Sequence, residues 1–399
     1  MKRCDISMYE DLKAKFHQQF QKTASWIFSA PGRTELGGNH TDHQRGRVLA
    51  AAVNLDTRAA VAPSQEPRIR ILSEGYPLCE ISLPAADPDE KEFGTTASLI
   101  RGVAARFQQL GHPVSGFDAY VVSDVLPGSG LSSSAAFEVL VGVIINTMGS
   151  CGLTPAEIAM VGQYAENVYF GKPCGLMDQT ASSVGNAITI DFADPGHPDI
   201  RPLPFDFSSC GHALCIIDSG AGHENLTHCY AAIPGELKAI CGYFHKEVLR
   251  EVPEADFYGN LPALRKLAGD RAVLRAIHVY EENKRVEAQA QALTQGNFPE
   301  FLRLVSQSGR ASWMLLQNVI PEGATEHQEL AFSLALAEHL LKGRGAVRVH
   351  GGGFAGTIQA FVPEDMLDSF RSGIEAVLGT GSCHVLSIRP EGGVLLETC

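Results

Sequence analysis

The sequence has no apolar run long enough to cross a membrane, because the longest, residues 135–145, is about half of a bilayer span and contains Glu138. The N-terminal residues mix basic and acidic side chains without an apolar stretch, so we expect no signal peptide. Basic side chains are in deficit: 32 Lys and Arg against 45 Asp and Glu give a net charge of -13, which disfavours nucleic acids and anionic membrane surfaces as partners. We therefore expect a soluble, cytoplasmic protein.

Closely spaced cysteines and internal repeats are absent as well. The 10 cysteines lie far apart in the sequence and form no Cys-x-x-Cys pair, which argues against a metal-binding or disulfide framework. We expect reduced thiols, as in other cytosolic proteins. Without a repeat or a low-complexity tract, the chain is expected to fold as ordinary globular domains.

The chain has room for two domains. With 399 residues and 45% hydrophobic content it can bury more than one core. Strand-like runs and helical periodicity alternate in both halves, which predicts a mixed α/β structure. Prolines at positions 195, 198, 202 and 204 break this pattern, so we predict domains over residues 1–195 and 196–399. The expected strands are residues 68–72, 119–122, 187–190, 214–217, 346–349 and 357–362, and the expected helices are residues 96–110, 137–148, 158–169 and 273–293.

One helix start can be placed from local chemistry. Thr154 is followed by Pro155 and, two residues later, by Glu157. This is the pattern of a capping box with proline at the first helical position. It predicts that the helix running toward Glu166 begins at residue 155.

A strand, a glycine-rich loop and a helix follow one another around residues 126–136, which read Leu-Pro-Gly-Ser-Gly-Leu-Ser-Ser-Ser-Ala-Ala. Gly128 and Gly130 allow the backbone to approach a ligand closely. The three serines at 132–134 offer hydroxyl and N–H groups where the helix begins. A serine cap alone would need only one of them. The segment predicts a polyphosphate site.

Two other nucleotide-binding patterns do not fit. A Walker P-loop needs a lysine at its end, and no lysine occurs between Lys91 and Lys172. Residues 351–356, Gly-Gly-Gly-Phe-Ala-Gly, match a dinucleotide fingerprint in spacing, but strand-like runs flank them on both sides. That loop is therefore not expected to open a helix, which excludes a Rossmann site.

Residues 29–46 concentrate polar groups between apolar flanks. They contain two arginines, two carboxylates, two histidines, an asparagine and a glutamine, punctuated by glycine. Convergent hydrogen-bonding groups of this kind suit a polyol. A metal cluster of His40, Asp42 and His43 is the competing interpretation, although no further ligand stands out elsewhere in the sequence.

In this order and at this separation, the three segments resemble the motifs of the GHMP kinases. Residues 32–42, Gly-Arg-Thr-Glu-Leu-Gly-Gly-Asn-His-Thr-Asp, resemble the galactokinase signature within that superfamily. The second segment resembles the phosphate loop, although Pro127 stands one residue closer to Gly130 than usual. The third resembles the last glycine-rich loop, with Ala355 in place of a glycine.

A fourth match strengthens the resemblance. Ala165-Glu166 and residues 171–179, Gly-Lys-Pro-Cys-Gly-Leu-Met-Asp-Gln, are similar to two further family elements at the same spacing. The resemblance spans about residues 25–363. Its first and fourth motifs favour the galactokinase family.

The resemblance implies an enzyme that transfers the γ-phosphate of ATP to the C1 hydroxyl of a sugar, galactose first. Asp178 is implied to face that hydroxyl, with Arg33 beside it. A carboxylate can accept the hydroxyl proton as attack develops, and an arginine can keep it ionised.

The remaining implied roles concern ATP, Mg²⁺ and the sugar. Ser134 and Glu166 are implied to hold Mg²⁺, a hard cation suited to a hydroxyl, a carboxylate and phosphates. The implied ATP contacts are Gly128, Gly130, Ser132, Ser133 and Ser134. The implied sugar contacts are Arg33, Asn39, His40, Asp42, Gly175, Asp178 and Tyr230.

The implied fold is the two-domain GHMP kinase architecture. It has an N-terminal domain like domain 2 of ribosomal protein S5 and a ferredoxin-like C-terminal domain, with the active site between them. Composition and periodicity by themselves indicate only mixed α and β structure (α+β). No oligomer is predicted, and a monomer is the favoured state.

The sequence departs from the galactokinase pattern in one place. Most members have a glutamate near the sugar C6 at the position of Asn39, and Asp42 is usually followed by tyrosine rather than His43. A neutral amide removes a charge that would repel a C6 carboxylate, and Asp-His-Gln also resembles the galacturonate kinases. A kinase for galacturonate or another sugar therefore stays open, as does a sugar-responsive regulator without catalysis.

Overall fold

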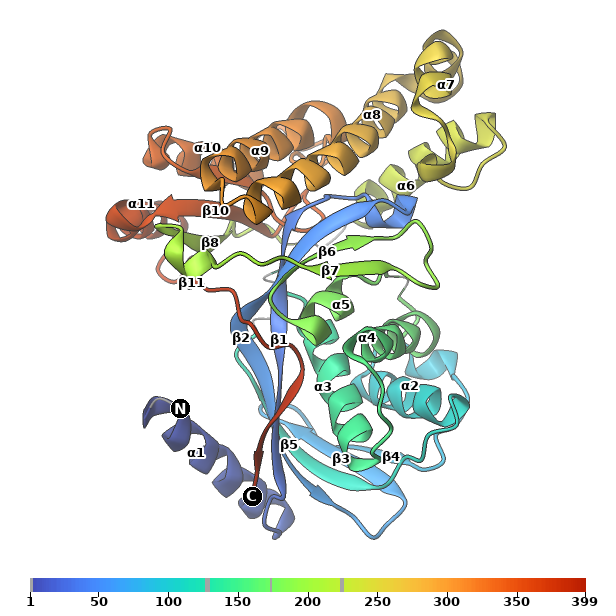
Figure 1. Cartoon of the computed structure of the whole chain (residues 1–399), viewed down its shortest axis with the longest axis vertical. Coiled ribbons are helices and arrows are strands. Elements are labelled where there is room, and N and C mark those ends of the chain that lie inside the picture. The colour runs from blue at the N-terminus through green and yellow to red at the C-terminus, as the bar shows by residue number, and fades with distance from the viewer. Residues whose placement is uncertain (1–2, 126–129, 173, 223–225) are drawn as a thin grey trace.

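Two β-sheets, each covered by helices, organise the chain in the computed structural model, which describes residues 3–125, 130–172, 174–222 and 226–399. Gly128, one of the expected phosphate contacts, lies outside these ranges. Figure 1 shows the larger sheet in the lower half and the smaller sheet with long helices in the upper half. The mixed α and β structure expected from the sequence is confirmed.

The larger sheet has eight strands in the order β12-β1-β2-β5-β3-β4, with β6 paired to β2 and β7 paired to β6. All pairs are antiparallel except β3 with β5. Its strands are β1 (Trp26–Gly37), β2 (Arg47–Pro63), β3 (Arg68–Ser73), β4 (Cys79–Ser82), β5 (Phe117–Ser123), β6 (Ala187–Asp191), β7 (Asp199–Pro202) and β12 (Val394–Thr398).

Helices pack on both faces of this sheet, because successive apolar side chains of β1 point to opposite faces and each face must be covered. Phe28 and Ala30 share a core with Phe107 and Val139 on one face. Ile27, pointing the opposite way, packs against the N-terminal helix. The helices are α1 (Arg3–Phe20) on one face and α2 (Thr96–Gln109), α3 (Ser133–Met148), α4 (Pro155–Tyr164) and α5 (Met177–Val184) on the other.

The smaller sheet is antiparallel, with the order β11-β8-β10-β9. Its strands are β8 (His212–Asp218), β9 (Ala346–Val349), β10 (Thr357–Pro363) and β11 (Cys383–Leu386). Numbered along the chain from 1 to 4, these strands lie side by side in the order 4-1-3-2, with helices after the first and the third strand. This is the β-α-β-β-α-β arrangement of ferredoxin-like domains, as the resemblance implied.

Helices make up the rest of the upper half, and the longest of them faces the larger sheet. Its hydrophobic residues Val286 and Leu293 share a core with Leu36 and Leu49 of β1 and β2. The helices are α6 (Thr227–Tyr243), α7 (Glu254–Gly259), α8 (Leu261–Thr294), α9 (Phe298–Ala311), α10 (Glu329–Leu341) and α11 (Leu367–Leu378).

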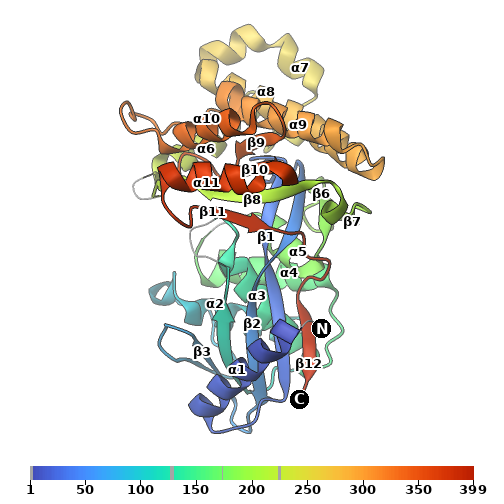
Figure 2. The ribbon, with the colours of Figure 1, turned by 90° about the vertical axis from the view of Figure 1, so that its left-hand side faces the viewer.

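The end of the chain returns to the larger sheet. In both ribbon views the N- and C-termini lie at the same end of the molecule (Figures 1 and 2). Strand β12 pairs antiparallel with β1, from Trp26 opposite Thr398 to Ser29 opposite Val394. We therefore propose that residues 394–398 belong with the N-terminal part, while the boundary near residue 195 stays a prediction.

The expected strands and helices all occur, and most of their ends shift by only a few residues. The exception is the helix expected over residues 273–293: α8 begins at Leu261, 12 residues earlier, and has a kink at Gly269, where the backbone is not helical. The helix expected over residues 158–169 is α4 followed by a π-helix, Ala165–Tyr169. Strands β1, β2, β4, β7, β11 and β12 were not predicted. Strands β1 and β2 are buried along almost their whole length, so their sequences do not alternate between apolar and polar residues.

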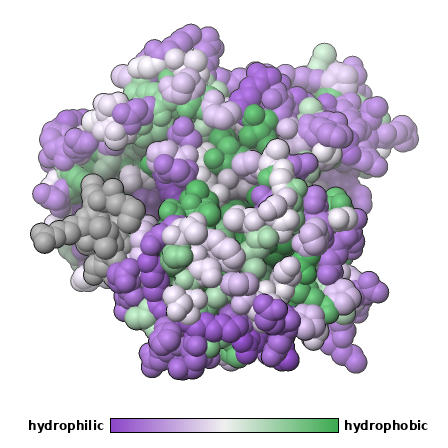
Figure 3. Space-filling view, turned by 60° about the horizontal axis from the view of Figure 1, so that its bottom comes forward, coloured by the Kyte–Doolittle hydropathy of each residue, from purple (hydrophilic) through white to green (hydrophobic). Residues whose placement is uncertain are grey.

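Surface and thiol chemistry follow the composition. None of the helices in the described part of the chain is long and apolar enough to span a membrane. On the face in Figure 3, hydrophilic side chains predominate at the periphery and apolar ones form small groups between them.

Nine cysteines in the described ranges are free thiols, as the sequence predicted for those positions.

The predicted capping box is present and gives the first testable consequence. The Thr154 hydroxyl accepts from the Glu157 N–H at 3.3 Å, and the Glu157 carboxylate accepts from the Thr154 N–H at 2.8 Å. Thr154→Ala should destabilise the protein by about 1 kcal/mol. The thermal midpoint, followed by circular dichroism, should fall by about 1–2 °C. Thr154→Ser keeps the hydroxyl and should stay near wild type; equal losses in both variants would contradict this role.

Candidate active site

A bidentate ion pair between Arg33 and Asp178 lies at the centre of the site. Arg33 is on β1 and donates from Nε to Asp178 Oδ1 at 2.7 Å and from Nη2 to Oδ2 at 2.8 Å. Asp178 is at the start of α5. Burial alone would raise the pKa of Asp178, but the charge and hydrogen bonds of Arg33, helped by the Ser132 hydroxyl, hold it below its ordinary value. The carboxylate is therefore ionised at neutral pH.

The same pair is joined to the predicted phosphate loop. Arg33 Nη1 donates to the Gly130 carbonyl at 2.5 Å, and the Ser132 hydroxyl donates to Asp178 Oδ2 at 2.5 Å. Ser132 has a left-handed backbone, φ 57°, and its side chain does not cap α3. A helix N-terminus whose cap side chain is used elsewhere can offer its N–H groups to an anion. The structure thus brings Arg33, Asp178 and the described part of the phosphate loop together.

Glu166 lies on the other side of the loop, in the π-helix after α4. It is 2% exposed, and its Oε1 accepts from Lys172 Nζ at 3.2 Å and from the Ser134 hydroxyl at 3.4 Å. π-Helical turns inside α-helices occur often at functional sites. A buried carboxylate next to a serine hydroxyl is a donor set that fits a hard cation shared with phosphates.

The third glycine-rich loop, residues 351–356, lies in the part of the chain with the smaller sheet and contacts residues 29–46, here called the sugar segment. It joins β9 to β10, so it opens no helix, as predicted. Three consecutive carbonyls of this loop accept hydrogen bonds from expected sugar contacts. The pairs are Asn39 Nδ2 with Gly351 O at 2.7 Å, His40 Nε2 with Gly352 O at 3.0 Å, and the Tyr230 hydroxyl with Gly353 O at 2.8 Å.

Asn39 is buried and its amide is fully oriented. Its Nδ2 also donates to Glu35 Oε1 at 3.2 Å, while its Oδ1 accepts from Asn318 Nδ2 at 2.9 Å. Burial raises the pKa of Glu35, although the charges of Arg348 and Arg33 oppose this. A glutamate at position 39 would face both the Glu35 carboxylate and the Gly351 carbonyl. The structure therefore gives a physical reason for a neutral amide at this position.

The histidine pair of the sugar segment has a defined hydrogen-bond direction. Gln44 Oε1 accepts from the Leu249 N–H at 3.0 Å, so its Nε2 donates to His43 Nδ1 at 3.2 Å. His43 Nε2 then carries the proton that it shares with His40 Nδ1 at 3.4 Å. This leaves His40 Nε2 as a donor, directed at Gly352 O. His43 thus fixes the tautomer of an expected sugar contact.

Asp42 and Gly175, two further expected sugar contacts, are neighbours. A Cβ built on Gly175 would lie 2.2 Å from Asp42 Oδ2. Only glycine fits there without moving Asp42, which explains the residue type. The printed contacts therefore join the expected site residues in three groups: Arg33 and Asp178 with Gly130 and Ser132, Asn39, His40 and Tyr230 with the third glycine loop, and Asp42 with Gly175.

Side chains of α8 hold the sugar segment from the opposite side, and sequence patterns did not predict this. Glu282 Oε1 accepts from the Gly38 N–H at 3.2 Å, and His278 Nε2 donates to the Asn39 carbonyl at 2.9 Å. Burial lowers the pKa of His278 to about 4, so it is neutral. The sequence shows that residues 278 and 282 are one helical turn apart. It does not show that they contact the backbone of Gly38 and Asn39.

The metal cluster considered for His40, Asp42 and His43 is not present. No group of three His, Cys, Asp or Glu side chains in the described ranges is arranged to hold a metal ion. The two histidines instead belong to the hydrogen-bond chain that ends at the third glycine loop.

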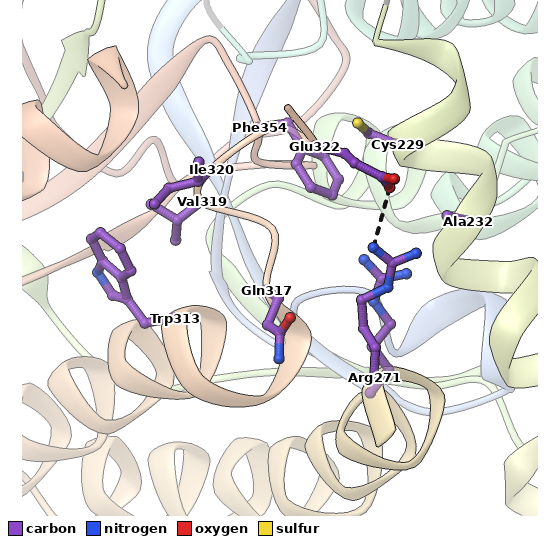
Figure 4. Close-up of a pocket in the computed structure, with 10 residues that line it drawn as sticks. Cys229, Ala232, Arg271, Trp313, Gln317, Val319, Ile320, Glu322 and Phe354 are labelled. Carbon is purple, nitrogen blue, oxygen red and sulfur yellow. Dashed lines mark hydrogen bonds and ion pairs between the residues drawn. The ribbon is translucent and has the colours of Figure 1, made fainter. Parts of the chain in front are cut away.

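A separate cavity of about 270 Å³ lies behind the third glycine loop, with Phe354 in its wall (Figure 4). The two arginines that line this cavity, Arg271 and Arg275, both form ion pairs with nearby glutamates. Arg271 pairs with Glu322 at 3.2 Å and with Glu236 at 2.6 Å, and Arg275 pairs with Glu236 at 2.9 Å. None of the expected site residues lines this cavity.

Comparisons with known proteins agree with this geometry. The family described as "Galactokinase galactose-binding signature" matches residues 14–63, and "GHMP kinases N terminal domain" matches residues 98–186. A galactokinase of Actinobacillus pleuropneumoniae serotype 3 (strain JL03) is 29% identical over 361 residues, which are 90% of each chain.

Solved structures extend the likeness to the whole fold. The Lactococcus lactis galactokinase complexed with galactose superimposes with a TM-score of 0.82 at 26% identity, covering 98% of this chain and 100% of that one. The Methanococcus jannaschii mevalonate kinase shares the fold with a TM-score of 0.64 at 15% identity, over 92% and 98% of the two chains. The chain therefore carries the galactokinase galactose-binding signature and the GHMP kinase N-terminal domain, and it has the fold of the GHMP kinases.

Proposed function

We propose that this chain is a galactokinase, which transfers the γ-phosphate of ATP to the C1 hydroxyl of α-D-galactose and yields galactose 1-phosphate and ADP. The observation that carries the proposal is the Arg33–Asp178 pair, hydrogen-bonded to Gly130 and Ser132 of the phosphate loop. It brings an ionised carboxylate, an arginine and a phosphate-binding helix start into direct contact. Phosphoryl transfer needs this combination of positioning and charge.

Asp178 is proposed to orient the C1 hydroxyl and to receive its proton. Because Arg33 keeps the pKa of Asp178 low, the carboxylate is a weak base toward a free alcohol. The hydroxyl becomes acidic only as its oxygen bonds to phosphorus, so the proton moves to Asp178 during transfer. The bond from the γ-phosphorus to the bridging oxygen of ADP breaks in the same step. Arg33 then stabilises the charge on the phosphoryl group.

ATP is proposed to bind at the start of α3. The backbone of Gly130, the N–H groups of Ser132, Ser133 and Ser134 and the hydroxyl of Ser133 would hold its phosphates, together with Gly128. Lys172, which contacts Glu166 at 3.2 Å, adds a positive charge at this end of the site. A helix N-terminus favours anions through its dipole and its free N–H groups.

Mg²⁺ is proposed to be held by Ser134 and Glu166 together with the phosphates. The hydroxyl and the carboxylate fit its preference for hard oxygen ligands. When bound, the ion would neutralise charge on the transferring phosphoryl group. The protein's own part is to keep Glu166 buried and oriented, which it does through Lys172, Ser134 and Gln179.

The sugar is proposed to bind between Asp178 and the third glycine loop, in contact with Arg33, Asn39, His40, Asp42, Gly175 and Tyr230. A sugar acid such as galacturonate is the second candidate substrate. The observation in its favour is that Asn39 has a neutral side chain, which would not repel a carboxylate at C6 as a glutamate at this position would. The cytoplasmic location and the monomeric state stay predictions.

A substrate panel tests the function. ADP release should be fast with galactose and ATP, and absent with methyl α-galactoside, whose C1 oxygen carries no proton to give up. The product should lose its reducing-sugar reactivity, since the phosphate occupies C1. No turnover of galactose would contradict the proposal. Faster turnover of galacturonate than of galactose or glucose would assign the second candidate.

Asp178→Asn tests the catalytic pair. It should lower kcat by about 10²–10⁴-fold, because the proton acceptor is lost, while ATP binding measured by calorimetry stays within a few-fold of wild type. The matched control is Asp118→Asn, since Asp118 is also buried and accepts from Arg70 at 2.6 and 2.9 Å, far from the site. That variant should lose stability with little change in kcat. Equal losses of kcat in both would contradict the assignment.

A further inference from the structure

Glu138 is a buried carboxyl group that the proposed mechanism does not use. It lies on α3, one helical turn after Ser134, and is 1% exposed. In the sequence it is the charged residue within the apolar run of residues 135–145. A buried, ionised carboxylate needs partners for its charge and its lone pairs. The partner that it has is Gln179.

Gln179 joins two carboxyl groups from different elements. Its Nε2 donates to Glu138 Oε2 at 3.0 Å and to Glu166 Oε2 at 2.9 Å. Both acceptors are carboxyl oxygens, so the amide nitrogen must face them and the orientation of the amide is fixed. Gln179 directly follows Asp178 on α5. One amide thus links the proposed metal ligand to the helix of the proposed catalytic aspartate.

The same two side chains leave two oxygens without partners. Within the described ranges, Glu138 Oε1 and Gln179 Oε1 are both buried and accept no hydrogen bond. A proton on Glu138 Oε1 would satisfy both atoms at once. The acid and the amide would then form a ring, with Nε2–H donating to Oε2 and Oε1–H donating to the amide oxygen. Ionised Glu138 would leave both oxygens unpaired.

We propose that Glu138 is a positioning residue, held as the neutral acid in a ring with the Gln179 amide, which in turn holds Glu166 in place for Mg²⁺. This neutral form keeps the proposed metal site at one negative carboxylate, next to the negatively charged phosphates of ATP. Burial, followed by the nearby Glu166 carboxylate, also raises the pKa of Glu138 well above its ordinary value. The inference rests on the proposed function only in taking Glu166 as a metal ligand.

Two substitutions separate the neutral acid from an ionised carboxylate. Glu138→Gln can keep the ring, because its amide N–H replaces the acid O–H. It should leave the thermal midpoint and the Mg²⁺ concentration for half-maximal activity within about twofold of wild type. Glu138→Leu cannot form the ring and should raise that Mg²⁺ concentration by about 10–100-fold, the usual cost of losing a group that orients a metal ligand. The KM for the sugar should change little.

Two readouts do not depend on turnover, so failure of this inference can be told from failure of the proposed function. Electron paramagnetic resonance should show weakened binding of Mn²⁺ with ATP in Glu138→Leu and normal binding in Glu138→Gln. Infrared spectra of the wild type at neutral pH should contain a protonated carboxyl band that Glu138→Gln removes. This second readout decides the case even where Glu138→Leu does not fold. The inference is overturned by absence of that band, by a loss in Glu138→Gln as large as in Glu138→Leu, or by no loss in either.

Discussion

The ion pair between Arg33 and Asp178 is the contact on which the rest of the site depends. It joins β1 of the larger sheet to α5, and through Gly130 and Ser132 it also fixes the start of α3. Each partner satisfies the other's charge at a place where neither is fully solvated. One pair of side chains therefore fixes the segments proposed to bind the phosphates and the sugar relative to each other.

The second constraint is the contact between the two halves of the molecule. The sugar segment belongs to the larger sheet, yet its backbone is held by Glu282 and His278 of α8, and Asn39 and His40 are held by the third glycine loop. The segment proposed to bind the sugar is thus held by both halves. If the proposal is right, a substitution in α8 or in the glycine loop alters sugar binding without a direct contact to the sugar.

The sequence was informative where a function is encoded by neighbouring residues. Arg33, the serines at 132–134 and Asp178 each belong to a short sequence motif. Helix α2 and the later part of α8 were predicted from the helical spacing of their hydrophobic residues. The strands β1 and β2 were missed because both are buried on two faces and lack alternation. Partners brought together only by packing could not be predicted. Glu138 was visible as a charge in an apolar run, but its partner Gln179 is 41 positions away.

The most direct test of the account is a crystal structure of the complex with galactose, Mg²⁺ and a non-hydrolysable ATP analogue. The account predicts that the C1 hydroxyl lies within about 3 Å of the Asp178 carboxylate, that Arg33 still pairs with Asp178, and that the terminal phosphate lies at the start of α3 beside Ser132–Ser134. A sugar bound with another hydroxyl facing Asp178, or a terminal phosphate held away from these serines, would contradict it.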